Sequence, residues 1–222
     1  MTRYKDPRYT INDSFYFAAL CALVDELDSQ EVNYSVVGGA AFQIKMASLL
    51  SGEKPFTTVA GLEGLLRKTG DIDLAVDSDL VSMVGLFNQM AATSHFYIDN
   101  TPRCVIIRKG YDSVSVNYQT GPEDFKGLSD HYHKIIDTSE TVLLSNRRRD
   151  LSVRIPSLKY LFASKLIRLK EKDKVDICNL LNVLSHKGKG DLNLEQVRSV
   201  LKSIDKEESF DYLCEVFYDF HS

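Results

Sequence analysis

The stretch RKTGDIDLAV, residues 67–76, decides the fold because it sets two acids in a segment that is otherwise apolar. Asp71 and Asp73 flank Ile72, and three further apolar residues follow. An apolar run of this length predicts a buried β-strand over residues 71–76. Because residues i and i+2 of a strand point to the same side, the two carboxylates are expected to project together, away from the core that receives Ile72.

Two carboxylates held this close repel each other, and one is driven to take up a proton unless a cation lies between them. A hard divalent ion such as Mg²⁺ removes the repulsion, takes oxygen ligands and usually bridges protein carboxylates to substrate phosphates. The alternative interpretation of the Asp-x-Asp pair is a capping or turn acid beside a surface acid.

A pair of glycines, Gly38 and Gly39, directly follows the strand-like sequence YSVV and opens a predicted helix. Adjacent glycines at such a turn let backbone N–H groups approach an anion closely, and the helix N-terminus adds positive potential. Alone, the pair indicates no more than a tight turn. Together with the two acids on a neighbouring strand, it indicates a phosphate cradle beside a metal-binding pair.

The composition is typical of a folded protein: 222 residues, 44% hydrophobic and 26% charged. The polar start predicts no signal peptide, and the longest apolar run, FYFAALCALV, is shorter than the roughly 20 residues that span a bilayer. No Cys-x-x-Cys pair occurs, so we expect reduced thiols and a cytoplasmic location. The short apolar runs also predict no membrane partner. The scattered cysteines are Cys21, Cys104, Cys178 and Cys214.

Charge is spread unevenly along a chain whose net charge is −4. Residues 147–174 contain ten Lys or Arg and three acids, and the rest of the chain is strongly acidic. Two interpretations are open: a solvated helix surface, or a basic wall that faces the phosphates of a nucleotide or a nucleic acid.

Periodicity and turn residues predict the remaining elements. Residues 53–70 are assigned to a loop or insertion with a short helix, and the chain after Pro156 is predicted to be helical, with breaks near Lys172 and at GKGD (188–191). Helices are predicted over 14–27, 40–50 and 80–92. The second is expected to end at a left-handed Gly52, and the third to be capped by Asp77 or Ser78 and to carry an apolar stripe of Val81, Val84, Phe87 and Met90. Strands are predicted over YSVV, 71–76, 95–99, 104–108, 113–119, 134–138, 141–145 and 151–155.

This order of elements predicts an α/β domain over residues 1–155 and a helical C-terminal region over 156–222 that packs on it. The motifs VVGGAAFQ and RKTGDIDLAV, with the later segment SKLIRLKEKDKVDICNLL (164–181), resemble the DNA polymerase β-type nucleotidyltransferase superfamily. The form is most similar to AbiEii-type toxins and related bacterial nucleotidyltransferase-like proteins. The matched segments span roughly residues 32–181, and 51–66 look inserted. The resemblance implies a mixed sheet flanked by helices.

Lys165 interrupts the apolar stripe of the helix predicted after Ser157. A charge at a buried position is costly unless an anion meets it, although a lysine can also carry its ammonium group out to solvent. Asp173 and Asp176 follow on the next turns and can serve as caps or as partners of Lys172. The residues alone leave these alternatives open.

The resemblance adds to the roles that the residues indicate. It agrees with Asp71 and Asp73 as ligands of Mg²⁺ or Mn²⁺ and with Gly38 and Gly39 as a cradle for the triphosphate, and it implies that Lys165 binds phosphate. It also implies nucleotide-site positions for a further set of residues: Arg67, Thr69, Arg168, Asp173 and Asp176.

The third carboxylate of the superfamily is missing from the strand SVSVNYQ, where Asn117 stands in its expected place. Alternation predicts that Asn117 points with Ser113, Ser115 and Gln119. An amide oxygen can coordinate Mg²⁺, but it carries no charge and is a poor base for an acceptor hydroxyl. Asp112 and Asp124 are possible substitutes outside the middle of the strand, and weak or conditional catalysis is expected.

The sequence therefore predicts a Mg²⁺-dependent nucleotidyltransferase that moves NMP from an NTP to a hydroxyl of tRNA, another RNA or a protein. The basic segment favours RNA. One alternative is a catalytically weak nucleotide-binding protein, or a partner in a toxin–antitoxin pair with a cognate antitoxin. A second is an adenylyltransferase that modifies a small molecule such as an antibiotic, which requires less basic surface.

Overall fold

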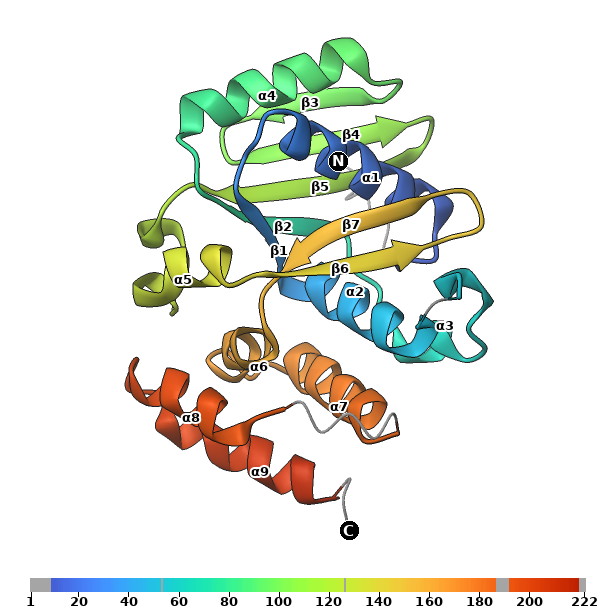
Figure 1. Ribbon diagram of the computed structural model, residues 1–222. Coiled ribbons are helices and arrows are strands. Elements are labelled where there is room, and N and C mark those ends of the chain that lie inside the picture. Colours follow the sequence, from blue (N-terminus) through green and yellow to red (C-terminus); the bar gives the residue numbers. More distant parts are fainter. Residues whose placement is uncertain (1–8, 53, 126, 187–191, 220–222) are drawn as a thin grey trace, which may run out of the picture.

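A computed structural model describes residues 9–52, 54–125, 127–186 and 192–219. Within these ranges the chain forms a mixed sheet flanked by helices, a separate β-hairpin and a helical C-terminal region (Figure 1). The strands are β1 (Tyr34–Val37), β2 (Asp71–Val76), β3 (Tyr97–Thr101), β4 (Cys104–Lys109), β5 (Asp112–Gln119), β6 (Glu140–Ser145) and β7 (Asp150–Ile155). The α-helices are α1 (Ser14–Ser29), α2 (Gly38–Ser51), α3 (Leu62–Leu65), α4 (Leu80–Thr93), α5 (Tyr132–Asp137), α6 (Leu158–Leu166), α7 (Glu171–His186), α8 (Leu194–Lys202) and α9 (Phe210–Asp219), and the 3₁₀ turns are η1 (Phe56–Thr58), η2 (Pro122–Asp124), η3 (Ser129–His131) and η4 (Glu207–Ser209).

The main sheet has the strand order β1-β2-β5-β4-β3, and only its β2–β5 pair is parallel. Burial alternates along β5, so Val116 and Tyr118 are buried while Asn117 is half-buried. Helix α4 covers the apolar face, where the ring of Phe87 lies 5.2 Å from that of Tyr118. The opposite face carries Asp73 and its polar neighbours.

Helix α2 is the structural centre of the molecule. It packs on β1, β2 and β6 on one side and on α6 and α7 on the other, so that α6–α9 gather beyond it in Figure 1. Ala40, Ala41 and Ala47 are buried and allow neighbouring elements to approach closely, while Phe42 meets Phe162 of α6 at 6.2 Å between ring centroids. The helix begins at Gly38, two residues before the predicted start.

The helical region is also connected to the loops beyond the sheet. The Nε2 of His131 in η3 lies 2.7 Å from the Oγ of Ser203, directly after α8. The Tyr132 hydroxyl accepts a hydrogen bond from Val76 N at 3.1 Å and lies within reach of the carbonyls of Val76 and Gln119, which holds α5 at the ends of β2 and β5. The division into two domains stays a prediction, since α2 contacts both regions.

The predicted strand over residues 134–138 is wrong, because this segment forms helix α5. Tyr132, Ile135 and Ile136 are buried, and their i, i+3 and i+4 spacing is that of one helical face. Ile135 and Ile136 favour a strand by their β-branched side chains, but tertiary packing decides the conformation.

Several predicted boundaries also need correction. The N-cap of α4 is Asp79, whose carboxylate accepts hydrogen bonds from Val81 N and Ser82 N, and Val81 is 81% exposed. The C-terminal helices break at residues 167–170, before Lys172, which lies inside α7. The predicted break at GKGD, residues 188–191, lies outside the described residues. Gly52 has the expected positive φ of 57°, although its ψ of −121° is not left-handed helical.

The predicted fold class is confirmed: a mixed α/β sheet with flanking helices is followed by a C-terminal helical region. No helix in the described ranges has the length and apolar character needed to cross a bilayer. The four cysteines are free thiols, of which Cys21 is buried.

Candidate functional site

The two acids lie where β1, β2 and β5 meet. Asp73 pairs with Val37 at the end of β1 and with Asn117 in the middle of β5. Asp71 and Asp73 are half-buried, while Ile72 between them is completely buried. The prediction that both carboxylates project from one face of the strand is therefore confirmed.

The glycine pair brings the N-terminus of α2 against these acids. Gly38 has a φ of 68°, and a Cβ atom at this position would lie 2.3 Å from Asp73 Oδ2. At Gly39 a Cβ atom would lie 2.8 Å from Arg67 Nη2. Both glycines are required by a close approach: the first to the carboxylate of Asp73 and the second to the guanidinium of Arg67.

The electrostatics of the pair favour a bound cation. Burial, followed by the neighbouring charge of Asp71, raises the pKa of Asp73, and a hydrogen bond from Asn117 with the charges of Arg168 and Lys165 opposes this shift. Asn117 Nδ2 donates to Asp73 Oδ1 at 3.1 Å, and Thr69 Oγ1 donates to Asp71 Oδ1 at 2.6 Å. The Oδ2 atoms of both acids have no hydrogen-bond partner among the described residues.

These two oxygen atoms fit a hard divalent ion that is shared between protein and phosphate. In the part of the chain that the structure describes, no group of three or more His, Cys, Asp or Glu side chains is placed to hold a metal. Mg²⁺ commonly uses only one or two carboxylates together with substrate phosphates and water. Asp71 and Asp73 could therefore hold a metal that arrives with a phosphate ligand, more readily than one that is bound permanently.

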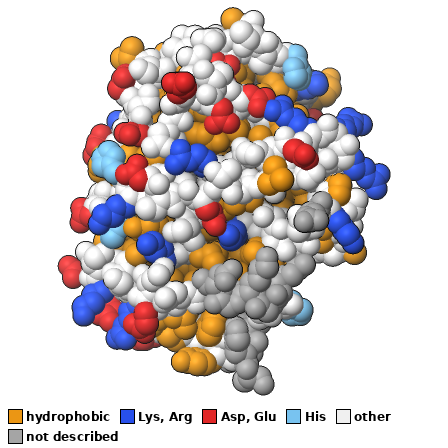
Figure 2. Space-filling view, in the orientation of Figure 1, with side chains coloured by type: hydrophobic (Ala, Val, Ile, Leu, Met, Phe, Trp, Pro, Cys, Tyr) orange, Lys and Arg blue, Asp and Glu red, His pale blue; other side chains and the backbone are white. Residues whose placement is uncertain are grey.

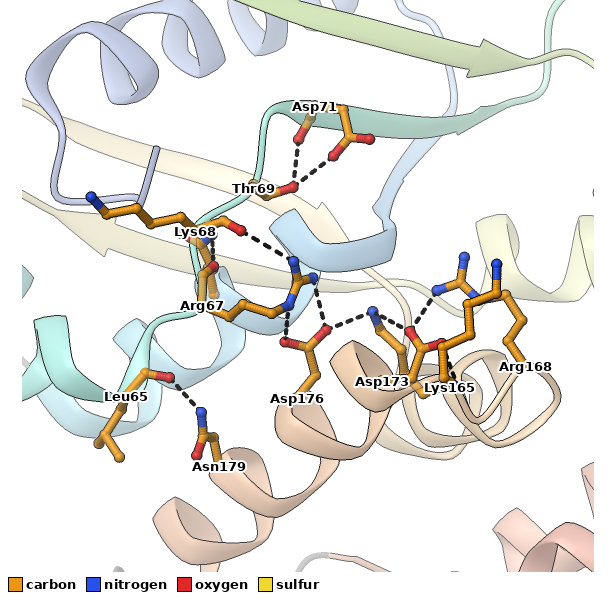
Figure 3. A network of polar contacts seen from close by, with 12 residues as sticks. Leu65, Arg67, Lys68, Thr69, Asp71, Lys165, Arg168, Asp173, Asp176 and Asn179 are labelled. Carbon is orange, nitrogen blue, oxygen red and sulfur yellow. Dashed lines mark hydrogen bonds and ion pairs between the residues drawn. The ribbon is translucent and has the colours of Figure 1, made fainter. Parts of the chain in front are cut away.

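A buried cluster of ions lies next to the pair and centres on Lys165 (Figure 3). The side chain of Lys165 is 1% exposed, and its Nζ lies 2.7 Å from Asp176 Oδ2 and 3.2 Å from Asp173 Oδ1. The same ammonium group lies 5.1 Å from the ring centroid of Phe42 in α2. The buried ammonium group of Lys165 therefore finds its anionic partners in the two aspartates of α7.

Two arginines complete the ion cluster, which we define as Arg67, Lys165, Arg168, Asp173 and Asp176. Arg67 holds Asp176 with two parallel hydrogen bonds of 2.9 and 3.0 Å, and Arg168 Nη2 donates to Asp173 Oδ1 at 2.9 Å. Bidentate pairs of this kind fix orientation as well as charge. Because Arg67 lies just before β2, the cluster ties α7 to the start of the strand that carries the acids.

The nucleotide-site residues expected from the sequence lie in the acid pair, its glycine turn or the ion cluster, except Thr69, which donates a hydrogen bond to Asp71. The pairing of Asp173 and Asp176 with Lys172 is not formed, because both acids turn to the ion cluster instead. Direct phosphate binding by Lys165 stays a prediction. Arg168 has a side chain that is 46% exposed, so it can reach a ligand without leaving the cluster.

Neither possible substitute for the third acid joins the pair. Asp112 opens β5 and by alternation points away from the face of Asn117, while its carboxylate accepts a hydrogen bond from Tyr9 at 3.2 Å. Asp124 lies in η2 and forms an ion pair with Arg103. Asn117 is therefore the side chain that completes the pair on β5.

Two supporting residues were not identified from the sequence. Gln43 of α2 accepts a hydrogen bond from Ile11 N at 2.7 Å and donates to the carbonyl of Arg67 at 2.8 Å. Tyr16 donates to the carbonyl of Asp71 at 3.1 Å. A polar Gln43 amid the apolar residues of α2 was the available signal, because buried amides require partners.

The basic residues between 147 and 174 do not form one wall. Arg149 pairs with Asp25 at the β6–β7 turn, and Arg154 donates to the carbonyl of Ile136 at 2.9 Å, while Lys165 is enclosed in the ion cluster. The positive charge that is concentrated in this stretch of sequence is thus distributed over separate parts of the folded protein.

No protein-family model matches this chain, and no curated protein matches it significantly in sequence.

The ion cluster generates a stability prediction. Asp176→Asn leaves Lys165 and Arg67 facing a neutral group, and removal of one partner from a buried pair costs about 3–5 kcal/mol of unfolding free energy. Lys165→Met should cost less, because Arg67 and Arg168 still neutralise the two acids. Glu171→Gln, which breaks the exposed pair with Lys174, is the control and should change stability by less than ~0.5 kcal/mol. Urea denaturation measures all three, and equal losses for Asp176→Asn and Glu171→Gln would contradict the assignment.

The raised pKa of Asp73 generates a pH prediction in EDTA. Between the ordinary carboxyl pKa and the raised native one, the native state binds a proton that the unfolded chain has released, so stability falls as pH rises through this window. Asp73→Asn should therefore raise the melting temperature at pH 7, by roughly 2–4 °C for each kcal/mol gained. The gain should shrink as the pH is lowered through the native pKa. A gain that does not depend on pH, or one matched by the exposed Asp130→Asn, would rule out this origin.

Proposed function

We propose that this protein is a nucleotidyltransferase that requires Mg²⁺ or Mn²⁺ and transfers NMP from an NTP to an acceptor hydroxyl. The observation that carries the proposal is the contact between Gly38 and Asp73 Oδ2, which sets a helix N-terminus against a pair of carboxylates. A helix N-terminus attracts phosphate, while carboxylate oxygens attract the cation that accompanies it. Because the helix N-terminus and the carboxylate pair are in close contact, one nucleoside triphosphate with its metal ion can interact with both.

Each residue of the site has a role in this proposal. Asp71 and Asp73 hold the metal, which when bound neutralises charge on the reacting phosphate. The backbone N–H groups at Gly38 and Gly39 orient the triphosphate, and Arg168 receives the departing pyrophosphate through its exposed side chain. Lys165, buried in the ion cluster next to the acid pair, adds positive potential at the phosphate position.

RNA, tRNA in particular, is the proposed acceptor on the strength of the resemblance to the superfamily. The basic residues of 147–174 add little to this choice, because they are divided among separate parts of the fold. A cytoplasmic location accords with NTP as substrate. The toxin-like resemblance extends the proposal to a cognate antitoxin as protein partner.

A second function, nucleotide binding with weak turnover, is favoured by one observation. Asn117 Nδ2 donates to Asp73 Oδ1, so a neutral donor stands where a third carboxylate would otherwise act as base. Such a protein would serve as a nucleotide sensor or as a component of a toxin–antitoxin pair. A small-molecule acceptor such as an antibiotic is the remaining alternative.

Transfer activity is tested by incubation with each of the four α-labelled NTPs, Mg²⁺ and total tRNA. We expect label on RNA from at least one NTP, and its loss in Asp71→Asn/Asp73→Asn, because the metal ligands are then gone. Parallel reactions without RNA, and with an aminoglycoside, detect transfer to protein or to a small molecule.

The same samples in a thermal-shift assay separate catalysis from binding. A rise in melting temperature that Mg-NTP causes in the wild type but not in Asp71→Asn/Asp73→Asn, without any labelled product, would support the sensor. If neither label nor thermal shift is observed, or if the double variant behaves like the wild type, the site does not bind nucleotide.

Asn117→Asp should increase both Mg²⁺ affinity and transfer. The substitution replaces a neutral donor by a charged acceptor opposite Asp73, and a positioned base contributes roughly 10²–10⁴-fold, so a rise of about tenfold or more is expected. Gln119→Glu, which adds the same charge on the same strand face opposite Ala75, is the matched control. High wild-type turnover that Asn117→Asp leaves unchanged would show that a third carboxylate is unnecessary.

A further inference from the structure

A large cavity lies away from the acids and the ion cluster. It has a volume of about 870 Å³ and is bounded by α1, η1, the end of α4 and the turn between β6 and β7. We call it the α1 groove. Its floor includes Phe17, Phe56 and Met90, and the rings of Phe17 and Phe56 lie 5.3 Å apart. A cavity of this size and apolar character is in the usual range for small-molecule sites.

Three consecutive arginines stand at one end of the α1 groove. Asn146 Oδ1 accepts hydrogen bonds from Arg148 N at 2.7 Å and Arg149 N at 2.8 Å, which fixes the backbone of the turn. Arg149 forms an ion pair with Asp25 of α1. The side chains of Arg147 and Arg148 make no hydrogen bond or ion pair within the described part of the chain.

The figures place this turn at the outside of the molecule. The β6–β7 tip projects at the right-hand edge of Figure 1, and Figure 2, in the same orientation, shows several basic side chains along that edge. Guanidinium groups with fixed backbones and no partner are suited to bidentate recognition of phosphate.

The wall of the α1 groove also contains hydrogen-bond acceptors without donors. Asn12 Oδ1 and Glu26 Oε1 are buried and have no partner among the described residues, and both side chains line the groove. Unpartnered buried oxygens are costly, and a ligand that donates N–H groups would relieve them once these side chains turn toward the groove.

Covalent chemistry is not indicated here. Burial raises the pKa of Cys21, which lines the groove, to about 11. The thiol therefore stays protonated near neutral pH and is a poor nucleophile. Cys21 therefore supplies no activated nucleophile to the α1 groove.

We infer that the α1 groove binds a nucleoside phosphate. The flat base lies on the floor of Phe17, Phe56 and Met90, its N–H groups face Asn12 and Glu26, and its phosphate meets Arg147 and Arg148. A simple anion would use the arginines and leave the apolar floor empty, whereas a purely apolar ligand would leave the arginines unpaired. The same chemistry is offered by a free mononucleotide and by the phosphorylated end of an RNA strand.

Titration calorimetry in EDTA tests this inference, because the proposed transfer site needs a metal and the α1 groove does not. The probes are the four 5′-mononucleotides, inorganic phosphate, and a short RNA with and without a terminal phosphate. We expect at least one nucleotide or the phosphorylated RNA to bind, and Arg147→Ser/Arg148→Ser to weaken it at least tenfold. Preference for the mononucleotide identifies a free ligand, and preference for phosphorylated over unphosphorylated RNA identifies a strand end.

Three variants serve as controls. Ala18→Trp fills the groove from α1 while keeping the arginines, and should abolish binding with little effect on thermal stability. Lys134→Ser/Lys202→Ser removes the same exposed charge elsewhere and should leave affinity unchanged. Asp71→Asn/Asp73→Asn should also bind normally, so failure of the transfer proposal and failure of this one are distinguishable.

Several results would overturn the inference. Binding of none of the probes would do so, as would inorganic phosphate binding as tightly as the nucleotide. Binding that survives Arg147→Ser/Arg148→Ser or Ala18→Trp, or that is lost in Asp71→Asn/Asp73→Asn, would place the ligand elsewhere.

Discussion

The burial of Lys165 between Asp173 and Asp176 is the interaction on which the arrangement of the site depends. A buried ion pair contributes little net stability compared with apolar packing, but any misplacement of its partners leaves an uncompensated charge. The ion cluster therefore acts mainly on specificity. It allows one position of α7 relative to α6, and through Arg67 it allows one position of the segment that leads into β2.

The balance of charge over the whole site follows from this arrangement. The ion cluster contributes three cations and two carboxylates, and the acid pair adds two more carboxylates. Fully ionised, the assembly carries one surplus negative charge. Burial first, and then the neighbouring charge of Asp71, raises the pKa of Asp73 within it. A divalent ion bound by the pair, as proposed, would reverse the sign of the surplus and make the same surface attractive to polyphosphate.

The sequence was informative wherever local pattern decides structure, and uninformative where distant segments meet. The strand of Asp71 and Asp73, its polar face and the glycine turn were predictable from alternation and spacing. The partners of Lys165 were not, because lysine and aspartate on consecutive helices can meet only after a turn at residues 167–170 whose direction the sequence leaves open. Residues 134–138 show the opposite failure: β-branched side chains favour a strand, but packing against β1 and β2 yields a helix. The α1 groove was equally invisible, since its walls come from four separate segments.

The single parallel pair in the sheet has a consequence for how the protein reaches its native state. Strands β3, β4 and β5 form a meander of local hairpins, whereas β2 joins β5 only after the chain has crossed through α4. Non-local pairing of this kind forms slowly. A slip of one residue would also turn Asp71 and Asp73 into the core and expose Ile72. A chain can thus be compact and rich in hairpins before the face that carries Asp71 and Asp73 exists. The registration of β2 is the event that separates a collapsed molecule from one with this face in place.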